Sequence, residues 1–401
     1  MHRKLDYFVC LGAGLCVFAM CGLAQSPNVS ASPAATTSPA TSVAYVYVSY
    51  APDIKSSNTH KIAGYKAWAD GTLTAMPQSP FNADVSSMAV NGKYLMASSN
   101  ATTYIETYQM EYGGVLGYVT QAEYAHYNNS SSDCGSASQI FFDHTGSSLY
   151  VHEINASSAC ANTGVASFAL NKSTGALSYL GLANDGAFPG SNRAAYFLGN
   201  NVDAYSANNS ACMYYSMYGY KRASNGLLSE IAYTQKNSPT PSSAFRIYVP
   251  NMAVADTTNH VAVHMLPANP PGCSNLPPQI AVFSADANGY LSTTSTYANM
   301  PVTLITNPYD MKMSASGKLL AVGGKEGLQI FHWNGASPAT HDTNLITTAP
   351  INQMFWDNAN HLYAISQSAV YVFTITPTGW SAAPGSPHAL ASPVALIVQP
   401  H

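Results

Sequence analysis

The stretch DGTLTAMPQSPF, from Asp70 to Phe81, places a turn dipeptide before a short run that contains β-branched residues. An Asp-Gly pair between apolar segments is among the strongest sequence signals for a β-hairpin. The same kind of turn recurs along the chain, with a β-forming segment before it. The seven turns are Asp70–Gly71, Gly113–Gly114, Thr174–Gly175, Asn225–Gly226, Asn288–Gly289, Asn334–Gly335 and Thr378–Gly379.

The spacing of these turns predicts the architecture. The intervals between Gly71 and Gly379 average about 51 residues, a period typical of propellers and solenoids. A second unit lies between successive hairpins and consists of an apolar strand, a small turn and another strand. Each repeat therefore supplies four strands, which is the content of a propeller blade. The copies of this unit cover residues 88–98, 140–153, 195–207, 252–265, 311–324 and 354–366.

The second unit occurs six times, whereas the hairpin occurs seven times. The two chain ends supply the missing copy if Pro393–Pro400 pairs beside Val43–Tyr50. Such pairing closes the ring and removes two exposed sheet edges. We therefore predict an all-β fold, a seven-bladed β-propeller of four-stranded blades closed by its N- and C-terminal strands.

The first 24 residues have the pattern of a secretory signal peptide. A basic start precedes an apolar run from Tyr7 to Leu23, and small residues come before a cleavage site after Ala24. Lipid attachment at Cys21 is the alternative, but Met20 stands where a lipoprotein signal usually has a small residue. We expect a secreted or periplasmic protein.

A linker and one folded domain follow the signal. Residues 25–42 are dominated by Ser, Thr, Pro and Ala, without charge, and such a segment cannot bury enough apolar surface to order itself. The propeller is expected to occupy residues 43–401. No other apolar run is long enough to span a membrane, so the mature chain is expected to contain no transmembrane segment.

Composition excludes some partners. Only 8% of the residues are charged, Lys and Arg total 15, and the net charge is −4. Nucleic-acid binding needs a concentrated basic surface, so we expect no nucleic-acid partner. The 27 tyrosines suit a β-rich secreted protein. We expect a monomer that binds a small-molecule or carbohydrate-like ligand and needs no cofactor.

Four of the seven cysteines remain after signal cleavage, an even number in an oxidising compartment. Propeller topology places all four on one face, and the simplest pairing joins Cys134 to Cys160 and Cys212 to Cys273. Zinc binding is the alternative, but no two of the four have the CxxC spacing of a zinc site. We expect two disulfides and no metal.

The pattern DGTLT, then SPF, then AVNGKYL (residues 70–74, 79–81 and 89–95) resembles the lactonase-type seven-bladed propellers. This group includes bacterial 6-phosphogluconolactonase, fungal carboxymuconate cyclase and the related YVTN-repeat surface proteins. The similarity extends over nearly all of the chain after the linker. It implies blade architecture more specifically than it implies catalysis.

Candidate site residues lie where the inner strands begin and, for Glu153 and His264, near the ends of second strands, because both positions share the predicted cysteine-bearing face. The resemblance implies an Arg that polarises a lactone carbonyl and a Glu or His that activates water. Arg193 keeps the family's position four residues before Phe197, although Ala194 replaces the family's His, and Glu153 is the matching acid. The other candidates, for ligand binding, are Asp84, Gln139, Arg246, His264, Asp310 and Gln353.

The sequence is compatible with two functions. The first is a lactonase-like propeller that binds a small or carbohydrate-like ligand and hydrolyses a lactone through Arg193 and Glu153. The second is a non-catalytic surface or scaffold propeller that binds protein or polysaccharide through its loops. An enzyme needs an Arg and an acid within hydrogen-bond reach of one substrate atom, whereas a scaffold does not.

Overall fold

The computed structural model describes most of the compact unit from Ala40 to His401. The described residues are 41–52, 60–99, 102–124, 136–154, 164–184, 194–208, 216–232, 234–240, 247–269, 272–273, 276–341, 343–376 and 379–401. For Glu153 and Cys273 only the backbone is described. The predicted signal peptide lies outside these residues, as does the predicted linker except for its last two positions.

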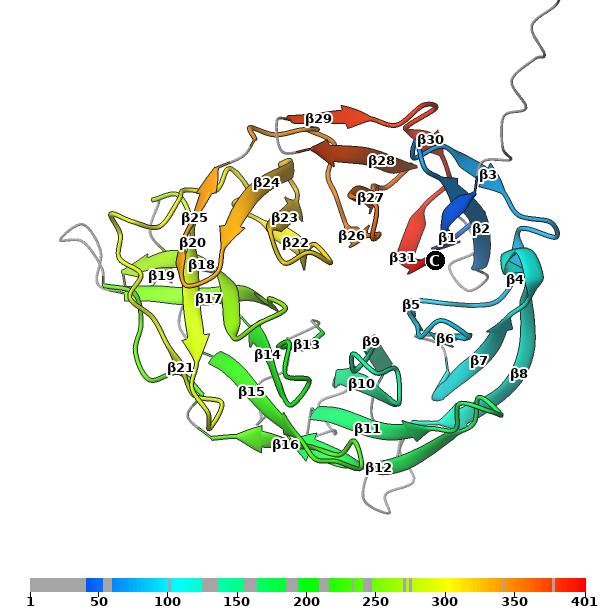
Figure 1. Cartoon of the computed structure of the whole chain (residues 1–401), viewed down its shortest axis with the longest axis horizontal. Coiled ribbons are helices and arrows are strands. Elements are labelled where there is room, and N and C mark those ends of the chain that lie inside the picture. The colour runs from blue at the N-terminus through cyan, green and yellow to red at the C-terminus, as the bar shows by residue number, and fades with distance from the viewer. Residues whose placement is uncertain are drawn as a thin grey trace, which may run out of the picture. The chain divides into compact units, whose positions relative to one another are not determined.

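The described strands form seven antiparallel sheets arranged around a centre, which confirms the predicted seven-bladed β-propeller (Figure 1). Blade 1 contains β31 (Pro393–Pro400), β1 (Ser42–Tyr50), β2 (Lys61–Trp68) and β3 (Leu73–Ala75), with β4 (Phe81–Asn82) paired to β2. Blade 2 contains β5 (Ser87–Val90), β6 (Tyr94–Ser98), β7 (Tyr104–Met110) and β8 (Leu116–Glu123). Blade 3 contains β9 (Ser136–Phe142), β10 (Ser148–Ile154), β11 (Gly164–Leu170) and β12 (Leu177–Asn184).

Blade 4 contains β13 (Tyr196–Phe197), β14 (Asp203–Asn208), β15 (Ser216–Arg222) and β16 (Leu228–Ile231). Blade 5 contains β17 (Ile247–Ala255), β18 (His260–Asn269), β20 (Gln279–Ala285) and β21 (Leu291–Ser292), with β19 (Gly272–Cys273) paired to β18. Blade 6 contains β22 (Pro308–Met313), β23 (Leu319–Gly324), β24 (Gly327–Asn334) and β25 (Ser337–His341). Blade 7 contains β26 (Gln353–Trp356), β27 (His361–Ile365), β28 (Ala369–Thr376) and β29 (Gly379–Ala382), with β30 (His388–Ala389) paired to β28.

Both chain ends complete blade 1, as the repeat count predicted. β31 pairs antiparallel with β1, from Ala44 opposite Pro400 to Tyr50 opposite Pro393. The C-terminal strand is therefore the innermost strand of blade 1, and the N-terminal strand is the second. This pairing closes the ring and protects both strands from exposure as free edges.

The predicted hairpin turns all connect the third and fourth strands of a blade. Most are tight turns, and in blade 2 the turn contains the short 3₁₀ helix η1 (Tyr112–Gly114). The turn glycines have positive φ angles, for example +97° at Gly226. A Cβ at Gly226 would also lie 2.2 Å from Oγ of Ser148 in the preceding blade, so this turn requires glycine for conformation and for space.

Buried tyrosines tie these turns to the neighbouring blade. Tyr47 of β1 donates a hydrogen bond to the Gly114 carbonyl at 2.7 Å, and Tyr205 of β14 does the same to Gly289. In each case the hydroxyl comes from a second strand and the carbonyl from the turn of the next blade. Tyr94 and Tyr150 repeat this contact at Ser173 and Gly226.

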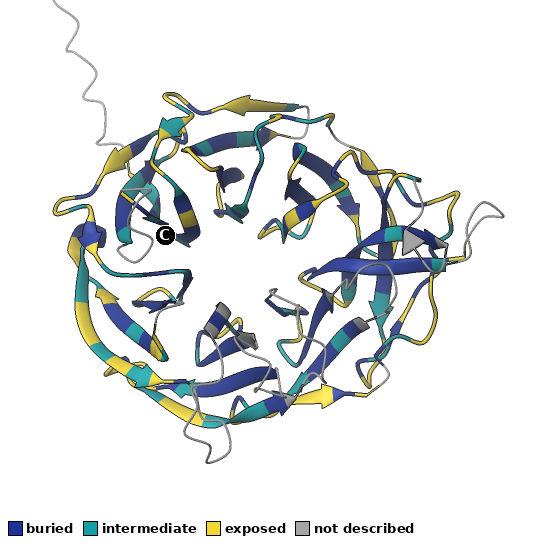
Figure 2. Cartoon of the chain, turned by 180° about the vertical axis from the view of Figure 1, so that it is seen from behind, coloured by how far each residue is buried: buried dark blue, intermediate teal, exposed yellow. Residues whose placement is uncertain are grey.

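The core lies between the faces of adjacent sheets. At the junction of blades 7 and 1, Val46, Val48 and Leu396 pack with Tyr363 and Val372. Buried residues are concentrated on the inner and middle strands, while exposed residues gather on the outermost strands (Figure 2). Among the described residues, no helix has the length and apolar character needed to cross a membrane.

Candidate functional site

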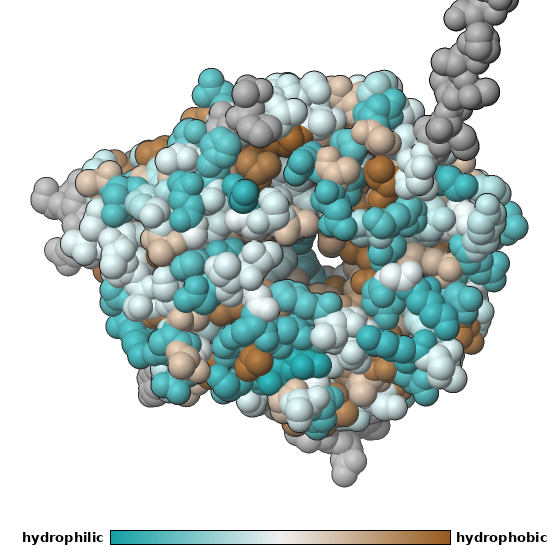
Figure 3. All heavy atoms as spheres, viewed as in Figure 1, coloured by the Kyte–Doolittle hydropathy of each residue, from teal (hydrophilic) through white to brown (hydrophobic). Residues whose placement is uncertain are grey.

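A cavity of about 600 Å³ lies at the centre of the ring, where the inner strands of the blades meet (Figure 3). Its wall extends from Gln139 and Gln353, near the starts of two inner strands, to turns between first and second strands, such as those at Asn91 and Thr257. The sequence predicted a pocket only on the face where the inner strands begin. The cavity also reaches the opposite face of the ring, where the first and second strands are joined.

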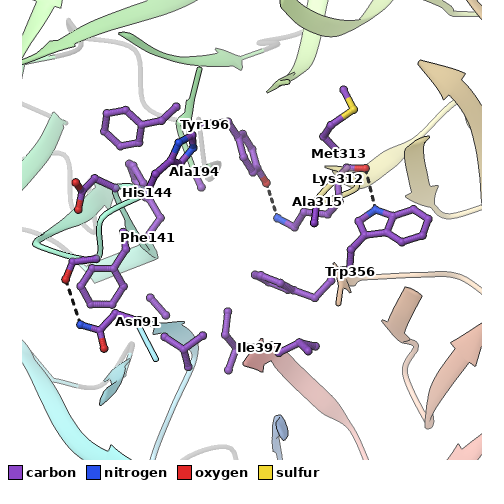
Figure 4. A pocket seen from close by; sticks show the side chains of 18 of the residues that line it. Asn91, Phe141, His144, Ala194, Tyr196, Lys312, Met313, Ala315, Trp356 and Ile397 are labelled. Carbon is purple, nitrogen blue, oxygen red and sulfur yellow. Dashed lines mark hydrogen bonds between the residues drawn. The ribbon is translucent and has the colours of Figure 1, made fainter. Parts of the chain in front are cut away.

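Much of the cavity wall is aromatic. Phe141 of β9, Tyr196 of β13, Phe355 and Trp356 of β26 and Ile397 of β31 contribute to it from four different blades (Figure 4). An apolar wall of this kind with a few polar groups is typical of small-molecule sites.

Lys312 of β22 contributes an ammonium group to this wall. Its ammonium donates a 2.5 Å hydrogen bond to the Tyr196 hydroxyl and forms an ion pair with Asp310 at 3.2 Å. It also lies 5.0 Å from the ring centroid of Phe355, so that ring stabilises the cation. The Trp356 indole N–H donates a hydrogen bond to the Lys312 carbonyl and so links β26 to β22.

The surroundings of Lys312 keep it charged. Burial disfavours the ammonium, but the Asp310 carboxylate and the Tyr196 oxygen more than offset burial and hold the pKa of Lys312 above its usual range. For His144, which also lines the cavity, burial is the larger effect. Desolvation lowers the pKa of His144 below 6.5 despite the nearby Asp143, so its imidazole is neutral at pH 7.

Three of the predicted site residues connect one blade to the next. The amide oxygen of Gln139 accepts the Ala194 N–H at 3.0 Å, and that of Gln353 accepts the Leu396 N–H at 2.6 Å. Asp310 does the same for the Met354 N–H at 2.7 Å. Each contact joins the inner strand of a blade to the inner-strand region of the following blade. Gln139 and Gln353 also line the cavity.

Two other candidates lie away from the cavity wall. Asp84 contacts the His60 ring at 2.5 Å and accepts a hydrogen bond from Ser99. His264 is fully buried in β18, where Nε2 contacts the Ile305 carbonyl at 2.9 Å. Neither residue belongs to the wall described above.

The remaining candidates fall where the structure gives no side chain. Arg193, Arg246, Cys134, Cys160 and Cys212 lie outside the described residues, and Glu153 and Cys273 are described by backbone alone. The roles of the first arginine and the glutamate, and the two disulfides, stay predictions. Over the described ranges, no group of three or more His, Cys, Asp or Glu residues is arranged to hold a metal ion.

Lys312 and Tyr196 were not among the site residues predicted from the sequence. A usable signal for the lysine was present, because Asp310 was a candidate and residues two apart on a strand share a face. The tyrosine carried no comparable signal. It lies 116 residues before Lys312 in the chain, and the arrangement of the blades around the centre brings the two side chains together.

The fold and the central cavity define a seven-bladed β-propeller, and comparison with known proteins supports that fold through structure alone. No family model matches the sequence, and no curated protein matches it. The similar solved structures include a periplasmic gluconolactonase from Pseudomonas aeruginosa, with 13% identity and a TM-score of 0.63 over 89% of this chain and 99% of that one.

Two further similar structures carry related names. A putative 6-phosphogluconolactonase from Bacteroides uniformis has 13% identity and a TM-score of 0.62, covering 89% of this chain and all of that one. One from Bacteroides fragilis has 12% identity and a TM-score of 0.61, covering 90% and 99%. Likeness at this level of identity establishes a shared fold across the propeller.

Proposed function

We propose that this protein is a secreted or periplasmic lactonase-like propeller that binds a small, carbohydrate-like ligand in its central cavity. The observation that carries the proposal is the aromatic wall around Lys312. Flat apolar rings accommodate the faces of a sugar ring, and a fixed ammonium orients an oxygen of the ligand. The signal-like sequence of residues 1–24 and the similarity to a periplasmic gluconolactonase support export.

We further propose that the ligand is a lactone and that the protein opens it. Water attacks the carbonyl carbon, the ring C–O bond of the tetrahedral intermediate then breaks, and the leaving alkoxide takes up the proton removed from the water, which gives a hydroxy acid. Glu153 would take the proton of the attacking water, and Arg193 would stabilise the negative oxygen. The position of Ala194 in the cavity wall, next to Arg193 in the chain, supports this assignment.

The test is hydrolysis of a panel of aldonolactones, followed by base uptake at constant pH and corrected for spontaneous opening. Loss of an oxyanion donor typically costs about 100- to 1000-fold in rate, so Arg193→Ala should lose that factor. Lys318→Ala, at an exposed position of the β22–β23 hairpin, is the charge-loss control and should keep the wild-type rate.

Two results count against the enzyme. Wild-type rates equal to the buffer blank on every lactone would remove hydrolysis of this panel and favour the non-catalytic binding propeller, to which the replacement of the family's His by Ala194 already points. An unchanged rate in Arg193→Ala would remove the role of that arginine.

A further inference from the structure

The carboxylates in and next to the cavity wall are occupied by the protein itself. Asp143 and Asp256 line the cavity, Asp310 is paired with the wall residue Lys312, and each of the three is more than nine-tenths buried. Each carboxylate accepts at least three hydrogen bonds or ion-pair contacts from the protein itself. Their partners include Asn201 and Arg222 for Asp143, His260 and Trp333 for Asp256, and Lys312 and Met354 for Asp310.

Hydrogen-bond donors do remain. A lysine ammonium has three donors and no acceptor, and Tyr196 and Asp310 use two of the three on Lys312. The described residues supply no other acceptor for Lys312, which lines the cavity. One N–H of this cation is therefore left for a ligand.

The two glutamines add donors of fixed orientation. A backbone N–H can only donate, so the contacts with Ala194 and Leu396 require the amide oxygens of Gln139 and Gln353 to face the neighbouring strands. The NH₂ group of each glutamine is then the end left for other partners. The described part of the chain places no acceptor on either NH₂ group, and both glutamines line the cavity.

We infer that this cavity is selective for a small organic acid, whose carboxylate binds the Lys312 ammonium while a flat face of the molecule packs on the aromatic wall. The inference rests on the proposed binding function and deepens it, because the hydroxy acid left by lactone opening belongs to this class. A carboxylate offers only acceptors and so matches the free donors of Lys312, Gln139 and Gln353. A neutral polyol lacks the charge that strengthens its contact with the ammonium, and a cation is repelled by it.

The experiment compares matched acid and neutral probes. Phenylacetate is paired with phenylacetamide, and D-galacturonate with D-galactose, with binding followed by calorimetry and by intrinsic fluorescence, since Trp356 lines the cavity. We expect the acid of at least one pair to bind about 10- to 100-fold more tightly than its neutral match, the size of a charge-assisted hydrogen bond. Lys312→Met should abolish that ratio, and Lys318→Met should preserve it.

A double variant guards against misfolding. Lys312→Met alone leaves Asp310 buried without its cation, which destabilises a fold, so Asp310→Asn/Lys312→Met removes both charges together. It should fold and bind acid and neutral probes equally. An acid preference that survives in the double variant, equal binding of acids and neutral probes by the wild type, or no binding of either acid would overturn the inference.

The outcomes separate this inference from the proposed hydrolysis. Lactone turnover without acid preference leaves the enzyme standing and removes the role of Lys312 in selecting acids. Acid preference that depends on Lys312, in a protein with no lactone turnover, removes the proposed hydrolysis and leaves the acid-selective cavity standing.

Discussion

At the scale of single residues, the tyrosines do more than fill the sheets. The four tyrosines that contact neighbouring turns are fully or almost fully buried. Burial of a phenol is favourable only when its hydroxyl finds a partner, and each of these hydroxyls finds a carbonyl of the next blade. These four tyrosines therefore have a structural role at the blade junctions.

Tyr205→Phe should lower the free energy of unfolding by about 1–3 kcal/mol, because the buried Gly289 carbonyl loses its hydrogen-bond donor. Urea unfolding followed by circular dichroism measures the change. The matched control is Tyr112→Phe, at a fully exposed tyrosine, and should stay within about 0.5 kcal/mol of wild type. Equal stability of the two variants would show that the junction hydrogen bond is energetically neutral.

At the scale of elements, aspartates organise several turns between the first and second strands. In blade 7, Asp357 accepts the backbone N–H groups of Ala359 and His361 and contacts the His361 ring at 2.7 Å and the Tyr363 hydroxyl at 2.9 Å. Asp143 and Asp256 occupy the same turn in blades 3 and 5. These carboxylates hold the hairpins that bring the inner strands to the cavity.

These carboxylates make stability depend on acid pH. Burial alone would raise the pKa of Asp357, but the hydrogen bonds from His361 and its backbone outweigh burial and hold the pKa below 3.8. A pKa that is lower in the folded state means that the contribution is complete above about pH 4 and is lost as the pH falls through the folded value. The fold should therefore weaken progressively below about pH 4.

Asp357→Asn should be less stable than wild type at pH 7 by about 1–3 kcal/mol, and the difference should shrink as the pH falls below about 4. Thermal melts between neutral and acid pH measure both trends. Glu123→Gln, at an exposed position of β8, is the control and should follow the wild-type curve. A difference between Asp357→Asn and wild type that is constant across pH would remove the ionised carboxylate as its cause.

At the scale of the whole molecule, stability depends on ring closure by β31 and β1. The last strand is the inner strand of blade 1, and it also packs against the inner strands of blades 7 and 2. Its loss would open β1 as an edge and remove one wall of the cavity, to which Ile397 and Gln399 contribute.

Deletion of the residues after Ser392 should therefore cause aggregation, because unpaired strand edges template pairing with other chains. Size-exclusion chromatography and thermal melting measure the effect. Deletion of His401 alone leaves β31 intact and serves as the control. A soluble truncated protein that melts like wild type would show that the ring does not need this strand.

The repeats predicted the fold well, and they predicted the site only in part. Turn glycines and alternating apolar strands are local signals, so the seven hairpins, the six inner hairpins and the closing pair all appeared where expected. Gln139, Asp310 and Gln353 lie on inner strands, but their hydrogen bonds across blade junctions had no sequence signal. Contacts of that kind depend on which blade follows which in space.

The sequence by itself determined the number of blades, the position of the turns and the strand that closes the ring. These features follow from backbone conformation and periodic burial, which a short segment expresses on its own. Only the tertiary structure decided that Lys312 meets Tyr196 and Phe355 over Asp310. The reason is physical, because a charge in a cavity wall depends on partners from three blades, and the arrangement of the blades around the centre sets their distance.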